Sequence, residues 1–312
     1  MPVPKDEYLS DIWRDGIFDG TVVFCTGGSG SLCSAQTRAL VHLGANAFIV
    51  GRNVEKVERM AKDIATSRNG ARVIGIGSID VRNPASLQTA INKCVSDLGA
   101  IDFVIAGAAG NFIAPIRALS TNAFKSVIDI DVLGSYNTAK LTLPHLIKSA
   151  AKSKSQRRSG LCATGRIIFV GASFPMTGMA LQTHASVAKA GINALSGNIA
   201  IEMGPLGVTS NVVVPGGIEG TEGMDRLSVA DETESSISLI PLGKLGTVKD
   251  IADATVYLFS DAGSYVNGDI LTVDGGAWRT SGGMLGRAMK YPDFFLSDED
   301  VKAARKGAKA KL

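Results

Sequence analysis

Short apolar segments that alternate with stretches of helical periodicity are the feature that most restricts the fold of this chain. The first segment, TVVFCTGG (21–28), is apolar throughout and ends in glycines, as is typical of strands in parallel sheets buried on both faces. Similar segments occupy residues 47–52, 72–81, 101–110, 165–173, 207–217 and 268–276. Between two of them, Ile192, Leu195 and Ile199 fall on one face of an amphipathic helix. The alternation predicts an α/β protein with a doubly wound, mostly parallel sheet.

The length and the charge balance exclude several classes of protein. The chain has 312 residues, enough for one large α/β domain, and 32 Lys and Arg against 29 Asp and Glu give a net charge of +3. This balance argues against a dedicated nucleic-acid binder, and no apolar run reaches the roughly 20 residues of a membrane span. The cysteines show neither metal-ligand spacing nor a disulfide framework, so we expect reduced thiols. They are Cys25, Cys33, Cys94 and Cys162.

The segments define one domain at 19–278, with an extension at 1–18 before it and a tail at 279–312 after it. The N-terminal residues carry both charges and lack an apolar signal core, so secretion is not expected. The basic stretch 149–164 predicts an insertion loop. Such a loop either solvates the surface or captures an anionic ligand, and the first interpretation is favoured because charge runs usually face solvent.

The turn TGGSGSLC (26–33) lies between the first strand and a helix and predicts a nucleotide-binding site. Glycines let the backbone approach a pyrophosphate, and the following helix N-terminus presents free N–H groups and positive dipole. A tight glycine turn without a ligand is the alternative, but the strand–turn–helix context of a Rossmann fold favours the cofactor. The residues expected to contact it are Gly27, Gly28, Ser29, Gly30, Ser31 and Leu32.

Arg52, at the end of the second strand, predicts that the cofactor is NADPH. Sites specific for NAD usually place a carboxylate there, which would repel a 2′-phosphate, whereas a guanidinium pairs with it. A plain surface arginine is the alternative. Asp80 and Val81 at the third strand end are placed to meet the adenine, and Ala108 lies in a turn near the cofactor. These three positions are also compatible with ordinary strand ends.

The chain resembles the short-chain dehydrogenase/reductase family over residues 20–276. The resemblance depends on TGG at 26–28, the turn 106–110, Ser173, Lys189 and PGGIEGT at 215–221. It implies that 19–278 is an NADP-binding reductase domain. Lys189, which we expect to open the helix KAGINAL (189–195), then binds the ribose hydroxyls of the nicotinamide half. The resemblance also implies cofactor contacts from Pro215, Gly216, Ile218 and Thr221.

The chain departs from the family pattern at several positions. Ser31 and Cys33 stand where the family has glycines, and Ala106 stands where it has Asn. The catalytic Tyr of the family lies four residues before Lys189, where this chain has Ala185. Because a carbonyl reductase needs an acid near the oxygen that it protonates, ordinary alcohol or ketone chemistry is put in question.

Tyr136 and Lys140 have the Tyr-x-x-x-Lys spacing in another place. They follow the fourth strand, whereas the family's pair follows the fifth. Residues four apart are neighbours on a helix face, so we interpret this pair as surface neighbours.

Within the family, the chain is similar to the 2,4-dienoyl-CoA reductases of the peroxisomal type. The matching motifs are AAGNF (108–112), HASVAK (184–189), PGGIEGTEG (215–223) and VDGGAW (273–278). Phe174 stands where the mitochondrial type has its Tyr. The terminal Ala310-Lys311-Leu312 is a close variant of the Ser-Lys-Leu address, which predicts a peroxisomal import receptor as partner and the peroxisomal matrix as location.

This resemblance implies NADPH-dependent reduction of 2,4-dienoyl-CoA to 3-enoyl-CoA in the β-oxidation of unsaturated fatty acids. Lys189, Asp131 and Asp274 are the expected catalytic residues. The alternatives are that Asp131 serves solely as the ion-pair partner of Lys189, and that Asp274 serves solely to form a turn. Asn111 and Ser173 are expected to polarise the thioester, or else to serve as turn and cap residues. Phe112 and Phe174 are expected beside the acyl chain, with core packing as the alternative.

Two other functions remain open at this point. One is a short-chain reductase that acts on a 3-ketoacyl thioester or another carbonyl, and the other is an NADPH-binding protein without catalysis. The family resemblance also implies a homo-oligomer, a dimer or a tetramer. We expect an acyl-CoA substrate, and no metal, nucleic acid or membrane span.

Overall fold

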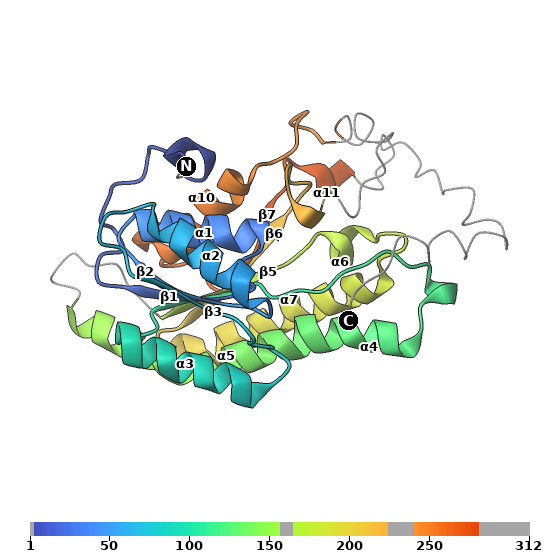
Figure 1. Ribbon diagram of the computed structural model, residues 1–312. Coiled ribbons are helices and arrows are strands. Elements are labelled where there is room, and N and C mark those ends of the chain that lie inside the picture. Colours follow the sequence, from blue (N-terminus) through green and yellow to red (C-terminus); the bar gives the residue numbers. More distant parts are fainter. Residues whose placement is uncertain (1–2, 157–164, 224–236, 238–239, 281–312) are drawn as a thin grey trace.

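Seven parallel strands form the centre of the molecule (Figure 1). The computed structural model describes residues 3–156, 165–223, 237 and 240–280. The strands are β1 (Val22–Thr26), β2 (Asn46–Val50), β3 (Val73–Ile76), β4 (Phe103–Ala106), β5 (Arg166–Val170), β6 (Thr209–Pro215) and β7 (Ile270–Val273). Their order is β3-β2-β1-β4-β5-β6-β7, and every neighbouring pair is parallel. The predicted doubly wound sheet is confirmed.

Helices cover both faces of the sheet (Figure 1). They are α1 (Ser31–His42), α2 (Val54–Ala65), α3 (Pro84–Leu98), α4 (Thr121–Ile128), α5 (Gly134–Gln156), α6 (Phe174–Thr177), α7 (Thr183–Met203), α10 (Val248–Phe259) and α11 (Ala277–Thr280). Alternate strand residues enter two separate cores, because successive side chains point to opposite faces. Val23 and Cys25 pack with α1, α2 and α10, whereas Val22 and Phe24 pack with α3, α5 and α7.

Local sequence explains where several helices begin. Asn53 accepts a hydrogen bond from the Lys56 N–H and caps α2, and Asn83 caps α3, whose first residue is proline. Thr247 and Asp250 form a reciprocal capping box at the start of α10. Helix α1 differs, because its N-cap is Gly30 and no side chain of the described residues caps it.

Two sequence predictions about helices are wrong. The stretch 149–164 is not a loop throughout, since α5 continues to Gln156, and residues 157–164 lie outside the described part. Ala, Lys and Gln in this stretch have good helix propensity, which explains the continuation. Lys189 does not open its helix, because α7 begins six residues earlier at Thr183.

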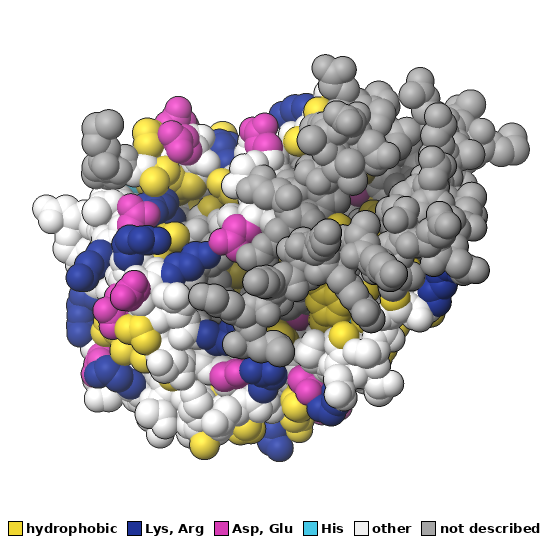
Figure 2. All heavy atoms as spheres, turned by 45° about the vertical axis from the view of Figure 1, so that its right-hand side comes forward, with side chains coloured by type: hydrophobic (Ala, Val, Ile, Leu, Met, Phe, Trp, Pro, Cys, Tyr) yellow, Lys and Arg dark blue, Asp and Glu magenta, His cyan; other side chains and the backbone are white. Residues whose placement is uncertain are grey.

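The surface is of mixed charge. On the face drawn in Figure 2, Lys and Arg side chains are interspersed with Asp and Glu over the described residues. Among the described helices, none combines the length and the hydropathy that crossing a membrane requires. The described cysteines Cys25, Cys33 and Cys94 are free and buried, and Cys162 lies outside the described residues.

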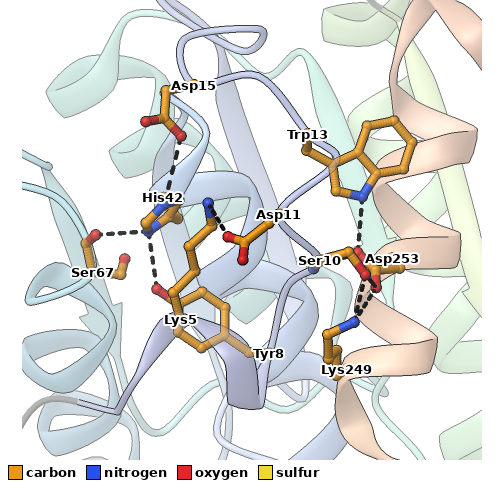
Figure 3. A network of polar contacts seen from close by, with 10 residues as sticks. All are labelled: Lys5, Tyr8, Ser10, Asp11, Trp13, Asp15, His42, Ser67, Lys249 and Asp253. Carbon is orange, nitrogen blue, oxygen red and sulfur yellow. Dashed lines mark hydrogen bonds and ion pairs between the residues drawn. The ribbon is translucent and has the colours of Figure 1, made fainter.

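Residues 3–18, which we call the N-terminal strap, pack across α1 and α10 (Figure 3). Asp253 of α10 accepts hydrogen bonds from the Ser10 N–H at 3.0 Å and from the Trp13 indole N–H at 2.8 Å. The Tyr8 hydroxyl lies 3.0 Å from His42 Nδ1 on α1, and the Tyr8 and Phe18 side chains are buried. The predicted extension is therefore joined to the domain by specific polar contacts.

Candidate active site

A cleft of about 290 Å³ lies at the carboxyl ends of β1, β4 and β5. Strand order reverses direction between β1 and β4, and ligands of doubly wound sheets bind at such a switch point. The lining residues are Gly27, Gly30, Ser31, Leu32, Cys33, Gly107, Ala109, Asn111, Val170, Thr221, Glu222 and Gly223. A larger depression of about 550 Å³ on α7, around Gly197 and Asn267, has no ionisable residue among those that line it. The cleft at the switch point is thus the better candidate for the active site.

Backbone crowding shapes the floor of this cleft. Gly27 has a φ of +67°, and a Cβ there would lie 2.8 Å from the Gly107 carbonyl oxygen. A Cβ on Gly107 would lie 2.1 Å from Cys33 Sγ. Glycine is therefore required where the first and fourth strand turns meet. The Thr26 hydroxyl joins the same two turns, since it accepts a 3.2 Å hydrogen bond from the Gly107 N–H.

The N-terminus of α1 points its first N–H groups toward this cleft. Gly30 offers no capping side chain, and Ser31, Leu32 and Cys33 both begin the helix and line the cleft. The first N–H groups of a helix have no partner within the helix and favour an anion. The departures at Ser31 and Cys33 leave this arrangement intact, because the Cys33 thiol fits against Gly107.

Arg52 and Asp80 lie together beyond β2 and β3. The Ser78 N–H donates to the Arg52 carbonyl oxygen at 3.1 Å, and the Arg52 side chain is exposed. Side-chain hydrogen bonds from Arg82, at 2.6 and 3.0 Å, lower the pKa of Asp80, and Arg52 adds to this effect. The Asp80 carboxylate is thus held ionised by arginines rather than left free for a ligand. Val81 is buried, and its carbonyl accepts a hydrogen bond from Asn137.

Asp131 and Lys189 form a buried ion pair. A π-helical turn at Asp129–Leu133 joins α4 to α5, and such turns are frequent at functional sites. Lys189 Nζ lies 3.1 Å from Asp131 Oδ2, and the two side chains are 11% and 1% exposed. Lys189 also donates to the Val170 carbonyl at 2.9 Å, and Asp131 accepts from the Gly110 N–H at 2.7 Å. The pair therefore connects α7 with the ends of β4 and β5, beside the cleft.

No tyrosine stands at the family position beside this pair. Ala185 occupies it and is buried. Tyr136 is 41% exposed, and Lys140 Nζ lies 5.6 Å from its ring centroid, which confirms that these two are neighbours on the helix surface. Asp131 and Lys189 thus form the ionisable pair that lies next to the Ala185 position, at the ends of β4 and β5.

The remaining predicted catalytic residues lie at the ends of β4, β5 and β7 and have local contacts of their own. Asn111 lines the cleft, and its Oδ1 accepts from the Phe112 N–H at 2.8 Å. Ser173 precedes α6, which begins at Phe174, and within the described residues its hydroxyl bonds to neither Asp131 nor Lys189. Asp274 accepts from the Gly276 and Trp278 N–H groups, both at 2.8 Å, which are turn contacts.

The segment after β6 reaches over the cleft. Gly216 packs directly against Asp274, since a Cβ on this glycine would lie 2.6 Å from Asp274 Cβ. Thr221 lines the cleft, and its hydroxyl donates to the Ile218 carbonyl at 2.8 Å. Pro215 ends β6. Of the four cofactor contacts predicted in this segment, Thr221 lines the cleft, whereas Pro215, Gly216 and Ile218 are not among its lining residues. Residues 224–236 lie outside the description.

Glu222 and Lys56 bridge the rims of the cleft, which sequence reasoning did not anticipate. Glu222 lies after β6, Lys56 lies on α2 after β2, and their charged atoms are 2.7 Å apart. β2 and β6 are four strand positions apart, about 19 Å at the usual spacing. The bridge therefore passes over the carboxyl ends of the strands between them.

His184 is a second residue that sequence reasoning missed. It lies in the first turn of α7, is fully buried, and stacks on Phe112 with ring centroids 4.2 Å apart. Its Nε2 lies 2.9 Å from the Phe112 carbonyl oxygen. The motif HASVAK contains this histidine, but a motif match does not reveal a contact 72 residues away along the chain.

Comparisons with known proteins agree with this geometry. Residues 28–277 match the family model described as enoyl-(acyl carrier protein) reductase. The chain is 48% identical over 291 residues to a peroxisomal 2,4-dienoyl-CoA reductase of Saccharomyces cerevisiae, covering 93% of this chain and 94% of that protein. It is 37% identical over 283 residues to a peroxisomal 2,4-dienoyl-CoA reductase of Danio rerio, covering 89% of each. The crystal structure of a short chain dehydrogenase from Bacillus anthracis is similar with a TM-score of 0.69 and 30% identity, covering 88% of this chain and 100% of that one.

Proposed function

Because the chain belongs to the short-chain dehydrogenase/reductase family, we propose that it reduces 2,4-dienoyl-CoA thioesters to 3-enoyl-CoA with NADPH. The observation that carries the proposal is the 48% identity, over 93% of the chain, to a protein named for this reaction and for its (3E)-enoyl-CoA product. The buried Asp131–Lys189 pair with Ala185 beside it fits the same reaction, since conjugate reduction needs no tyrosine next to a ketone oxygen.

The first-turn residues fit a dinucleotide. The close approach of Gly27 to Gly107 and the side-chain-free start of α1 leave backbone N–H groups for a pyrophosphate. The exposed side chain of Arg52 supports NADPH, because a guanidinium would pair with a 2′-phosphate that a carboxylate would repel. Lys189 would hold the nicotinamide ribose. When bound, NADPH supplies a hydride for the δ-carbon of the dienoyl group.

The side chains near Asp131 are then assigned to stabilise the negative charge that develops on the thioester and to supply a proton to the substrate. Reduction at the δ-carbon moves an electron pair through the conjugated system to the thioester oxygen. Asn111 and Ser173 are the donors that we assign to this oxygen, because donors placed where charge develops stabilise the transition state. The positive charge of Lys189 favours the same anion.

Protonation of the substrate dienolate at its α-carbon leaves the double bond at position 3. We propose that Asp131 and Asp274 relay this proton through water to the α-carbon. Asp131 is the stronger candidate, because it contacts the Lys189 ammonium, which can pass a proton on, whereas Asp274 accepts from N–H groups of its own turn. Phe112 and Phe174 are assigned to the acyl chain.

The proposal includes a location and an assembly. The relatives named as peroxisomal cover nearly the whole chain, which supports a peroxisomal enzyme of β-oxidation. Ala310-Lys311-Leu312 lies outside the described residues and is proposed as the signal that an import receptor binds. Removal of these three residues should leave the protein in the cytosol, and an unchanged distribution would contradict the signal.

We also propose a homo-oligomer, which light scattering of the purified protein would test.

Oxidation of NADPH by the purified protein is the test of the reaction. A medium-chain 2,4-dienoyl-CoA should be reduced, and a 3-ketoacyl-CoA at the same concentration should not. Formation of a hydroxyl product from the ketoacyl thioester would instead indicate a carbonyl reductase. Tight NADPH binding without turnover of either thioester would indicate a non-catalytic protein.

Variants separate cofactor choice from chemistry. Arg52→Ala should weaken NADPH binding by about tenfold or more while leaving NADH binding unchanged, because the lost contact is with the 2′-phosphate. Asp131→Asn and Asp274→Asn should each lower kcat with little change in the Kd of NADPH. Full activity of either Asp variant would remove that residue from the mechanism.

A further inference from the structure

His184 joins the start of α7 to the segment that follows β4. Its ring lies almost parallel to that of Phe112, with an interplanar angle of 15°. The Phe112 carbonyl oxygen accepts from His184 Nε2 at 2.9 Å and from Gln182 Nε2 at 3.3 Å. One carbonyl therefore receives two side-chain donors, from residues that are two apart in the chain.

These contacts fix the tautomer of the imidazole. A carbonyl oxygen can only accept, so His184 Nε2 must carry the hydrogen in this contact. Burial lowers the pKa of His184, so the ring is neutral at physiological pH and Nδ1 carries a lone pair. Nδ1 is buried and has no hydrogen-bond partner among the described residues. A buried unpaired nitrogen is unfavourable, so stability alone does not account for histidine here.

The segment 110–114 is held at three points. The Gly110 N–H donates to Asp131 at 2.7 Å, the Phe112 carbonyl is bound by His184, and the Ala114 N–H donates to the Leu181 carbonyl at 3.1 Å. Asn111 lies between the first two points and lines the cleft. Its direction toward the cleft is thus set by Asp131 on one side and by His184 on the other.

We propose that His184 is a positioning residue, which aims Asn111 and Phe112 at the thioester substrate by holding the Phe112 carbonyl. The role rests on the proposed function, because Asn111 is assigned to the thioester oxygen there. His184 itself need not touch the reacting atoms. The effect of its loss should appear in the reaction of the thioester and not in the binding of NADPH.

Three variants separate the donor from the ring. His184→Phe keeps the ring on Phe112 and removes the donor, whereas His184→Gln keeps a donor of similar reach. His184→Asn has a shorter side chain whose amide falls short of the carbonyl, and it replaces His184→Phe if that variant does not fold. His145→Gln, on a half-buried histidine of α5, is the matched control.

His184→Phe should lower kcat/KM for a 2,4-dienoyl-CoA by about tenfold or more, since a small misplacement of a positioned group can cost about a hundredfold. Most of the loss should be in kcat, because Asn111 acts on charge that grows in the transition state. His184→Gln should recover kcat/KM to within about threefold of wild type, and the Kd of NADPH should change by less than about twofold in every variant. The control should match wild type.

Hydrogen exchange provides a second measurement that does not depend on the reaction. The Ala114 amide should exchange faster in His184→Phe, or in its Asn replacement, than in His184→Gln. Unchanged exchange and kcat/KM on loss of the donor would overturn the proposal, as would equal damage in the Gln variant. If wild-type protein does not reduce the dienoyl thioester, the proposed function fails, and the exchange data still decide whether His184 holds the segment.

Discussion

Removal of the Asp131 carboxylate should destabilise the protein far more than removal of its neighbour Asp129. Asp131→Ala leaves the Lys189 ammonium buried without its counter-ion and the Gly110 N–H without its acceptor. Breaking a buried ion pair by removing one partner costs about 3–5 kcal/mol. At about 2 °C per kcal/mol for a domain of this size, the Tm of the cofactor-free protein should fall by about 6–10 °C.

Asp129→Ala is the matched control, two residues away on the same turn. Asp129 pairs with Lys125, whose side chain is 66% exposed, and an exposed pair contributes at most about 1 kcal/mol, or about 2 °C. Differential scanning fluorimetry at low and high salt measures both variants. High salt should leave the Asp131→Ala difference unchanged, because buried pairs are screened little. Equal, small shifts in the two variants would refute the argument from burial.

Three further predictions follow from other contacts. Glu222→Ala should speed NADPH release by no more than about fivefold, and less at high salt, because the bridge to Lys56 is exposed; stopped-flow fluorescence measures this. Burial raises the pKa of Asp253, but hydrogen bonds from the strap and α10 lower it by more, so the folded-state pKa lies below the usual value. The carboxylate therefore stabilises the fold above about pH 4, and this contribution is lost as the pH falls through the folded-state pKa. The stability difference between wild type and Asp253→Asn, from urea unfolding, should therefore shrink below about pH 4, and a constant difference would contradict this. Gly107→Ala should weaken NADPH binding and destabilise by about 1–3 kcal/mol, because its Cβ would overlap Cys33, whereas Gly197→Ala has open space and should not destabilise.

The fold was accessible from the sequence because the signals are local. Each strand is an apolar run a few residues long, and helix starts such as Asn53 and Asn83 carry their own capping atoms. The boundary of α5 was missed for the opposite reason. The basic composition of its last residues is compatible with a loop or a helix, and their helix propensity favours the helix, which extends to Gln156.

The glycine turn of the site was predicted from local sequence, whereas contacts between distant side chains were predicted only where the family resemblance supplied the partners. Asp131 and Lys189 were expected to be near one another, and the ion pair bears this out. The contact of His184 with Phe112 spans 72 residues and that of Lys56 with Glu222 spans 166. No periodicity or spacing in a single sequence encodes such pairs, because they exist only once the sheet brings distant turns to one edge.

The N-terminal strap has a consequence for the order in which the protein forms during synthesis. Ser10 leaves the ribosome early, but its partner Asp253 follows 243 residues later. At about 5–20 residues per second, the strap waits roughly 12–50 s for the helix that it binds. The contact of Tyr8 with His42 on α1 can form early, whereas the contacts of Ser10 and Trp13 with Asp253 close only after α10 has been synthesised.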